Sequence, residues 1–220
     1  MSNAASSPFV GRHYRSGRPV LVEIGDGHIA SVRDAELSPG ETNRLPWLAP
    51  GFIDVQSNGY GGQEFSSPEL TAEKVAVITE RQSAFGVTQY CPTVTTAGRA
   101  TILHALAAIA EACRRWPAVD HAVAGIHVEG PYISPDDGPR GAHPVIHCRP
   151  PDWDEFQQLQ SAAAGRIRIL TMAVEYAEAP AFIDRAVASG VVIAIGHTAA
   201  NSAQIRAAVD AGAYLSTHLG

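Results

Sequence analysis

The stretch that decides the fold is Ala122-Val-Ala-Gly-Ile-His-Val-Glu129, an apolar run that ends in a carboxylate. Two later apolar runs have the same form, and they lead to His197 and His218. Short apolar runs separated by helical stretches are typical of consecutive strands in a parallel β/α sheet. The carboxyl ends of such strands share one rim, where functional side chains collect. We therefore predict that Glu129, His197 and His218 lie together.

The strand and helix pattern repeats along most of the chain. Predicted helices separate the strands: the first has Ser67 as its N-cap and Pro68 in its first turn, and a later one begins near Asp152. Gly190 and Gly212 follow the last two helices as expected C-caps. The predicted strands cover residues 49–56, 88–94, 122–129, 167–174, 191–196 and 213–217.

The repeat favours a (β/α)₈ TIM-type barrel over a doubly wound sheet. No glycine-rich nucleotide loop follows the first predicted strand, as a dinucleotide site would require. A full barrel takes about 250 residues. We therefore expect about six βα units here and a barrel that is incomplete at its C-terminal side. The predicted domains are residues 1–47, part of a small β-sandwich accessory domain, and residues 48–220, the barrel domain.

The first of these domains shows one clear hairpin. Alternating apolar residues at 20–24 and 28–32 flank the turn Gly25-Asp26-Gly27. No further strand of a small sheet is predicted before the barrel pattern begins. Because an isolated two-stranded hairpin is marginally stable, we expect that the rest of this sheet is absent from the chain.

Composition limits the classes of protein that fit. The net charge of −6 and the absence of a Lys/Arg cluster argue against nucleic acid as a partner. No run of 18 or more apolar residues exists, so a membrane span is not expected. The three cysteines Cys91, Cys113 and Cys148 lack metal-type spacing, which favours a reduced, cytoplasmic protein.

Glu129, His197 and His218 suit a catalytic metal ion. One carboxylate and two imidazoles leave a coordination position open for water, whose pKa the metal lowers towards neutrality. Each residue alone is more often a buried, hydrogen-bonded polar group, but their shared position at strand ends favours a metal. We expect one divalent ion, zinc first, although iron, manganese and cobalt tolerate the same ligands.

Other polar residues lie near these strand ends. Gln56 and Asn58 are two residues apart at the end of the first strand, so their side chains share a face and suit a water or a substrate amide. A simple turn at Asn58 is the alternative. His143, in the long loop after Glu129, can polarise a carbonyl or bind an oxyanion, or it is only solvated. His127 shares a strand face with Glu129 and either supports it or belongs to the core.

Several segments, in order along the chain, resemble the N-acetylglucosamine-6-phosphate deacetylase family of the amidohydrolase superfamily. They are Ala49-Pro-Gly-Phe-Ile-Asp-Val-Gln-Ser-Asn-Gly59, Gly125-Ile-His-Val-Glu-Gly-Pro-Tyr132, Gly141-Ala-His-Pro144, Ile195-Gly-His-Thr-Ala-Ala200 and Ala211-Gly-Ala-Tyr-Leu-Ser-Thr-His-Leu219. The resemblance implies that Glu129, His197 and His218 hold a single catalytic metal. It also implies that the amide pair Gln56 and Asn58 replaces the His-x-His of binuclear relatives.

The resemblance further implies that Ala142 and His143 bind the substrate, an amino sugar phosphate. The implied reaction converts N-acetylglucosamine 6-phosphate to glucosamine 6-phosphate and acetate, in a homodimer. The general base of the family, an aspartate after the eighth strand, is absent from these residues. Gly220 also departs from the family, which usually has an aromatic residue and Asn-Ala there. The alternatives are an amidohydrolase of a non-phosphorylated or cyclic amide, or a non-catalytic fragment or binding protein.

Overall fold

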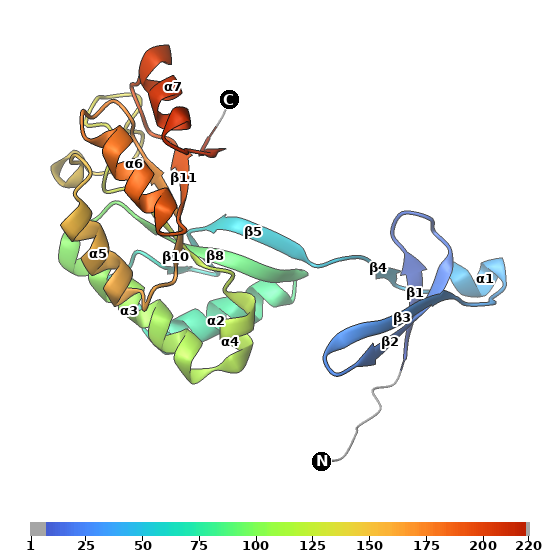
Figure 1. The fold of residues 1–220 in the computed structure, drawn as a ribbon. Coiled ribbons are helices and arrows are strands. Elements are labelled where there is room, and N and C mark those ends of the chain that lie inside the picture. Colours follow the sequence, from blue (N-terminus) through green and yellow to red (C-terminus); the bar gives the residue numbers. More distant parts are fainter. Residues whose placement is uncertain (1–7, 219–220) are drawn as a thin grey trace. The chain divides into compact units, whose positions relative to one another are not determined.

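The computed structural model describes residues 8–218, and the chain divides after Gly51 into two compact units (Figure 1). Leu219, which ends the last resembling segment, and Gly220, where the sequence departs from the resemblance, lie outside the described residues. Among residues 8–218, no helix combines the length and the hydrophobicity that crossing a membrane requires.

The smaller unit is a four-stranded sheet in the order β3-β2-β1-β4. Its predicted hairpin is confirmed, with Gly25 opposite His28 and positive φ angles at Asp26 and Gly27, as a tight two-residue turn requires. The elements of this unit are β1 (Phe9–His13), β2 (Pro19–Gly25), β3 (His28–Asp34), α1 (Pro39–Thr42) and β4 (Trp47–Leu48).

The expectation that this hairpin lacks sheet partners in the chain is wrong. Strand β1 pairs antiparallel with β2, and β4 pairs parallel with β1. The sequence of β1 hides the strand because Gly11 interrupts its apolar pattern. A Cβ at Gly11 would lie 2.3 Å from Leu48 Cγ, so the glycine lets the Leu48 side chain pack directly on the β1 backbone.

The larger unit contains a six-stranded parallel sheet in the order β12-β11-β10-β9-β8-β5, which confirms the predicted succession of strands. Strands of this sheet that follow one another along the chain are neighbours in the sheet. Helices lie along one face of it (Figure 1). The strands are β5 (Phe52–Ser57), β8 (Val87–Thr95), β9 (Ile126–Glu129), β10 (Ile167–Met172), β11 (Val192–Ile195) and β12 (Leu215–Ser216), and a separate hairpin comprises β6 (Gly59–Tyr60) and β7 (Gln63–Glu64).

The connecting helices are those expected, with two differences. The first begins at Ala72 rather than after Ser67, because Thr71 is the residue whose side chain caps it by accepting from Lys74 N. Residues 117–122 are helical, so the third strand starts later than predicted. The helices are α2 (Ala72–Ser83), α3 (Arg99–Arg115), α4 (Pro117–Ala122), α5 (Trp153–Ala162), α6 (Ala179–Ala188) and α7 (Ser202–Asp210), with a short 3₁₀ turn, η1 (Val145–His147).

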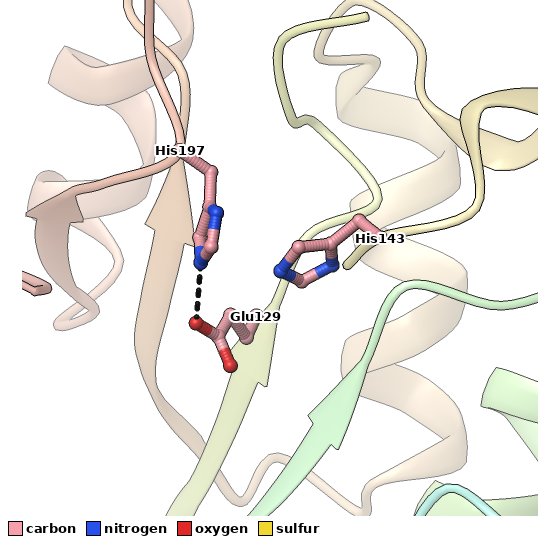
Figure 2. A group of neighbouring side chains, drawn as sticks. All are labelled: Glu129, His143 and His197. Carbon is pink, nitrogen blue, oxygen red and sulfur yellow. Dashed lines mark hydrogen bonds and ion pairs between the residues drawn. The ribbon is translucent and has the colours of Figure 1, made fainter. Parts of the chain in front are cut away.

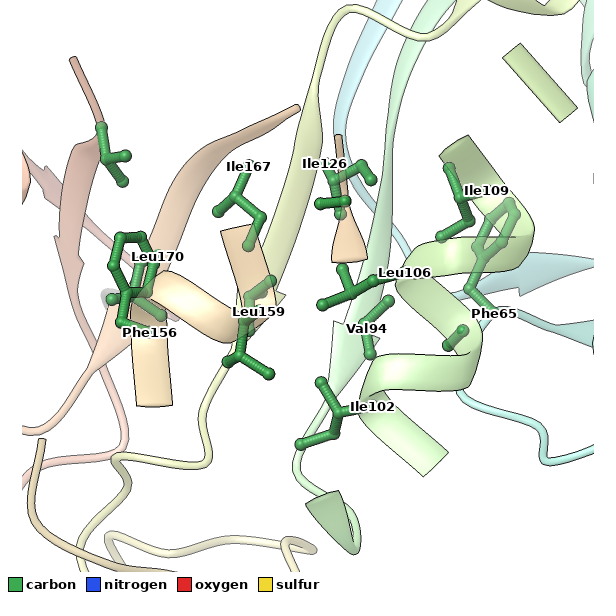
Figure 3. Close-up of a cluster of buried hydrophobic side chains, with 14 of the residues drawn as sticks. Phe65, Val94, Ile102, Leu106, Ile109, Ile126, Phe156, Leu159, Ile167 and Leu170 are labelled. Atoms are coloured by element: carbon green, nitrogen blue, oxygen red, sulfur yellow. The ribbon is translucent and has the colours of Figure 1, made fainter. Parts of the chain in front are cut away.

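The hydrophobic core lies between the sheet and these helices (Figure 3). Successive strand residues face opposite sides of a sheet. In β9, Ile126 and Val128 therefore join the core with Leu106 of α3, whereas His127 and Glu129 face the other side. This alternation explains how a fully buried strand carries two polar side chains away from the helices.

Candidate active site at the strand ends

The structure brings the three predicted ligand residues together at one rim of the sheet. Glu129 is the last residue of β9, and His197 and His218 each follow a strand, β11 and β12, by two residues. Both histidines have positive φ angles, 51° at His197 and 57° at His218. Residues other than glycine rarely adopt this left-handed backbone conformation, and those that do concentrate at functional sites.

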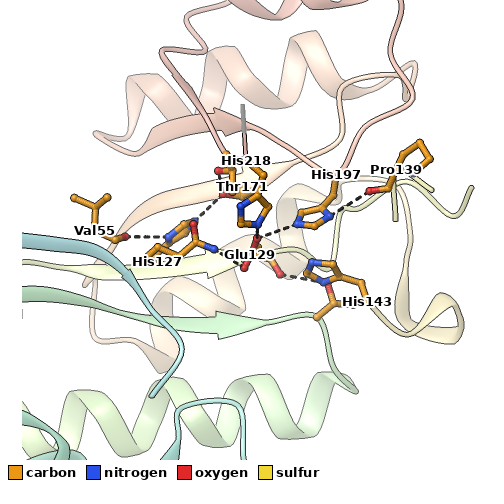
Figure 4. A network of polar contacts seen from close by, with 11 residues as sticks. Val55, His127, Glu129, Pro139, His143, Thr171, His197 and His218 are labelled. Carbon is orange, nitrogen blue, oxygen red and sulfur yellow. Dashed lines mark hydrogen bonds and ion pairs between the residues drawn. The ribbon is translucent and has the colours of Figure 1, made fainter. Parts of the chain in front are cut away.

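Glu129 is the centre of the cluster, because both its carboxylate oxygens are engaged (Figure 4). Its Oε1 lies 3.0 Å from His197 Nε2 and 3.2 Å from His218 Nε2. Its Oε2 accepts a hydrogen bond of 3.0 Å from Gln56 Nε2. The carboxylate side chain is only 3% exposed, whereas that of His218 is 59% exposed. The cluster therefore has a buried side and an open side.

The charges of Glu129 and His197 stabilise one another. Burial raises the pKa of Glu129, but the hydrogen bond and the charge of His197 outweigh it, so the pKa is lowered overall. The same hydrogen bond raises the pKa of His197 above its usual value. His197 Nδ1 lies 3.2 Å from the carbonyl oxygen of Pro139, which fixes the ring and directs Nε2 at Glu129 (Figure 2).

The contacts of Glu129 Oε1 with His197 Nε2 and His218 Nε2 can be compared with the spacing of ligands around one metal ion. Two ligands about 2.0–2.1 Å from one tetrahedral ion are about 3.3 Å apart. The separations of 3.0 and 3.2 Å from Glu129 Oε1 to the two imidazoles are close to this value. The set of one carboxylate oxygen and two imidazole nitrogens suits a divalent ion of borderline softness. A His/Glu cluster that could hold a divalent ion is therefore present, and the described residues whose donor atoms all lie within 4.8 Å of one another are Glu129, His143 and His197.

His143 lies beside this cluster instead of being solvated. Its side chain is buried, and its ring centroid is 4.2 Å from that of His197. Donor atoms of Glu129, His143 and His197 lie within 4.8 Å of one another (Figure 2). Burial, and then the charge of His197, lower the pKa of His143. Its position therefore suits a second role at the same site.

A pocket of about 260 Å³ opens over the cluster, and every site residue predicted from the sequence contributes to its wall. Asn58 lines the pocket, and its backbone carbonyl accepts a hydrogen bond from Phe65 N. The contact between Gln56 and Glu129 was not predicted, and neither was any role for Thr96. The lining residues are Gln56, Asn58, Thr95, Thr96, Glu129, Ala142, His143, Pro144, His197 and His218.

His127 lies on the same sheet face as Glu129 and supports the cluster through a row of hydrogen bonds (Figure 4). Its Nδ1 lies 3.1 Å from the carbonyl oxygen of Val55, so this nitrogen donates. Its Nε2 lies 2.7 Å from Thr171 Oγ1, and Thr171 in turn contacts Thr217 Oγ1 at 2.8 Å. The row joins β5, β9 and β10 to the residue before His218.

The fold and the site define the chain as a parallel β/α protein with a Glu–His cluster at the carboxyl ends of its strands, an arrangement suited to hydrolytic chemistry. No protein-family model matches the chain. Curated relatives do match: the chain is 37% identical over 175 residues to N-acetylglucosamine-6-phosphate deacetylase of Bos taurus, covering 78% of this chain and 42% of that protein. It is 32% identical over 206 residues to N-acetylgalactosamine-6-phosphate deacetylase of Shewanella sp. (strain ANA-3), and this match covers 90% of this chain and 50% of that protein.

Solved structures agree with these relatives. The N-acetyl-D-glucosamine-6-phosphate deacetylase of Mycobacterium smegmatis shares 35% identity and a TM-score of 0.77, over 92% of this chain and 52% of that one. The corresponding enzyme of Pasteurella multocida, at 22% identity and a TM-score of 0.79, shares the fold. The chain is therefore a homologue of the N-acetylglucosamine-6-phosphate deacetylases, and it spans about half the length of the curated relatives it matches.

Proposed function

We propose that this chain carries the metal-binding half of a deacetylase that hydrolyses the acetamide of an N-acetylated amino sugar 6-phosphate. The observation that carries the proposal is the contact of one buried carboxylate, Glu129, with the imidazoles of His197 and His218 at three strand ends. Relatives named as deacetylases of N-acetylglucosamine 6-phosphate and of N-acetylgalactosamine 6-phosphate support this substrate class. N-acetylglucosamine 6-phosphate is the first candidate, because most of these relatives bear its name.

Glu129, His197 and His218 would hold one divalent ion, zinc first, with iron, manganese or cobalt fitting the same ligands. When bound, such an ion polarises the acetyl oxygen and lowers the pKa of water. Gln56 orients the Glu129 carboxylate through its hydrogen bond, so that Oε1 faces both histidines. This supporting contact is the kind that tunes a ligand's orientation and affinity.

Ala142, His143 and Asn58 line the pocket beside this cluster and would contact the substrate. His143 would act on the acetyl carbonyl, where negative charge develops during attack by water, and its place in the pocket wall beside His197 supports this role. The proton acceptor that the family resemblance implies, an aspartate after the eighth strand of a complete (β/α)₈ barrel, would come from outside these residues, as would the phosphate contacts. A reduced, cytoplasmic homodimer completes the proposal.

Metal analysis of the purified 220-residue chain tests the first half of this proposal. We expect about one equivalent of zinc per chain. Glu129→Ala should abolish metal retention, because it removes the carboxylate that both histidines contact. His121→Ala, an exposed histidine in α4, is the matched control and should retain the metal. Full metal occupancy in the Glu129 variant would refute the assignment.

Acetate release tests the second half, in a protein that also contains the remaining strands of the barrel, with N-acetylglucosamine 6-phosphate, N-acetylgalactosamine 6-phosphate and unphosphorylated N-acetylglucosamine as substrates. Release from either phosphate, lost in Glu129→Ala, supports the proposal. Release from the unphosphorylated sugar alone would favour another amidohydrolase. Metal binding without release from any of them, in a protein that also contains the missing strands, would favour a binding protein.

A further inference from the structure

Thr96 connects the metal-binding cluster to His143, although nothing in the sequence singles it out. It follows the last residue of β8 and is only 4% exposed. Its hydroxyl oxygen lies 3.2 Å from the backbone carbonyl oxygen of Glu129 and 2.8 Å from His143 Nδ1. One hydroxyl thus contacts both the residue at the centre of the cluster and the histidine beside it.

The direction of these two hydrogen bonds follows from the chemistry of the groups. A carbonyl oxygen can only accept, so the single hydroxyl proton of Thr96 is donated to Glu129. The Thr96 oxygen must then accept from His143, which places a proton on Nδ1 of that ring. In a neutral ring the other nitrogen, Nε2, is left with a lone pair. Figure 2 shows this nitrogen of His143 directed towards Glu129 and His197.

We propose that Thr96 is a positioning residue that holds His143 in the tautomer with its proton on Nδ1 and aims the Nε2 lone pair into the pocket. An imidazole without such a partner populates both tautomers, and the other one would present an N–H to the pocket.

The Thr96 hydroxyl has little freedom to turn away. Gly130 follows Glu129 with a φ of 88°, and a Cβ at this position would lie 2.0 Å from Thr96 Oγ1. The glycine therefore lets the hydroxyl pack directly against the backbone at the end of β9. Thr96, Glu129 and Gly130 form a close-packed unit at which the orientation of His143 is set.

The consequence concerns what His143 offers to the pocket. Neutral His143 accepts a hydrogen bond through Nε2 or donates its lone pair to a cation, and it donates to an oxyanion only after Nε2 has taken up a proton. The catalytic meaning of this order of events rests on the proposed deacetylase function. The tautomer itself does not, and it can be measured without substrate.

The test is a long-range ¹H–¹⁵N correlation spectrum of the metal-free 220-residue chain with ¹⁵N-labelled histidine, at about pH 8, where an imidazole of ordinary pKa is neutral. The wild-type chain should show His143 with its proton on Nδ1. Thr96→Val, which removes the hydroxyl and keeps the shape, should lose this pattern, and Thr96→Ser should restore it. Thr93→Val, a buried hydroxyl on the same strand that bonds Cys91 O, is the control and should keep it.

A wild-type spectrum with the His143 proton on Nε2, or an unchanged tautomer in Thr96→Val, would overturn the proposal. If Thr96→Val does not fold, as judged by its thermal transition, the wild-type and Thr96→Ser spectra decide. The outcomes are distinct from those of the proposed function. An Nδ1–H tautomer would keep Thr96 in its positioning role even if a protein that also contains the remaining strands of the barrel released no acetate, a result that would refute the deacetylase.

Discussion

At the scale of single residues, the two candidate histidine ligands have a left-handed backbone, as Asp26 and Ala164 also do. A left-handed conformation in a residue other than glycine costs about 1–3 kcal/mol, so neighbouring contacts must hold it. At His197 those contacts are visible. Its carbonyl oxygen accepts from Ser134 N, and the next two residues, Thr198 and Ala199, both donate to the carboxylate of Glu175. Glu175 therefore holds the turn that aims the His197 ring.

This arrangement predicts that Glu175→Ala weakens metal binding without removing a ligand. We expect an affinity for zinc about 10- to 100-fold lower, the usual effect of losing a group that orients a ligand. A competition titration with a chromogenic chelator measures it. Glu178→Ala, an exposed acidic residue three positions along the chain, is the control for loss of charge. Equal affinities in the two variants would show that the turn keeps its shape without the carboxylate.

At the scale of elements, the row of hydrogen bonds through His127 and Thr171 ties strands together beneath the site. Thr171 is fully buried and shares its hydroxyl with His127 and Thr217. Thr171→Val would leave His127 Nε2 without its partner. An unsatisfied buried polar group costs about 1–3 kcal/mol.

We therefore expect Thr171→Val to lower the free energy of unfolding by about 1–3 kcal/mol, measured by urea denaturation. Thr88→Val, at the exposed start of β8, is the matched control and should change it by less than about 0.5 kcal/mol. A Thr171 variant as stable as the control would mean that water or a rotated Thr217 replaces the lost contact.

The elements also show what a sequence can and cannot predict. The strand ends at Glu129, His197 and His218 were predictable because apolar runs stop there, and the parallel order then brings distant residues to one rim. Strand β1 was not, because its pairing depends on a close contact between Gly11 and Leu48 that no periodicity reveals. The role of Thr96 was hidden for a similar reason. Threonine is ordinary after a strand, and only the fold places its hydroxyl between Glu129 and His143.

At the scale of the whole molecule, Cys91 gives a pH dependence of stability. Burial raises the pKa of its thiol to about 11. The unfolded thiol ionises near its ordinary value of about 8.5, so between these values the folded chain binds more protons than the unfolded one. Raising the pH through this interval therefore favours unfolding.

We expect the free energy of unfolding to fall by at most about 1.4 kcal/mol per pH unit from this thiol as the pH rises from about 9 to about 11. Urea denaturation at several pH values measures the slope. Cys91→Ala should show a shallower decline, because alanine does not titrate. Parallel declines in the two chains would show that the thiol is ionised equally in both states.

The positions of the candidate ligands along the chain have a mechanical consequence. Glu129 is 68 residues from His197 and 89 from His218, so a cation held by all three would cross-link segments that are distant along the chain. Such a cross-link favours the folded state by about 2.7 kcal/mol when free metal is at 100 times its dissociation constant. The melting temperature should then rise with the free zinc concentration and fall on addition of a chelator. Loss of the cation would thus lower the free energy of unfolding as well as remove the metal's part in the reaction.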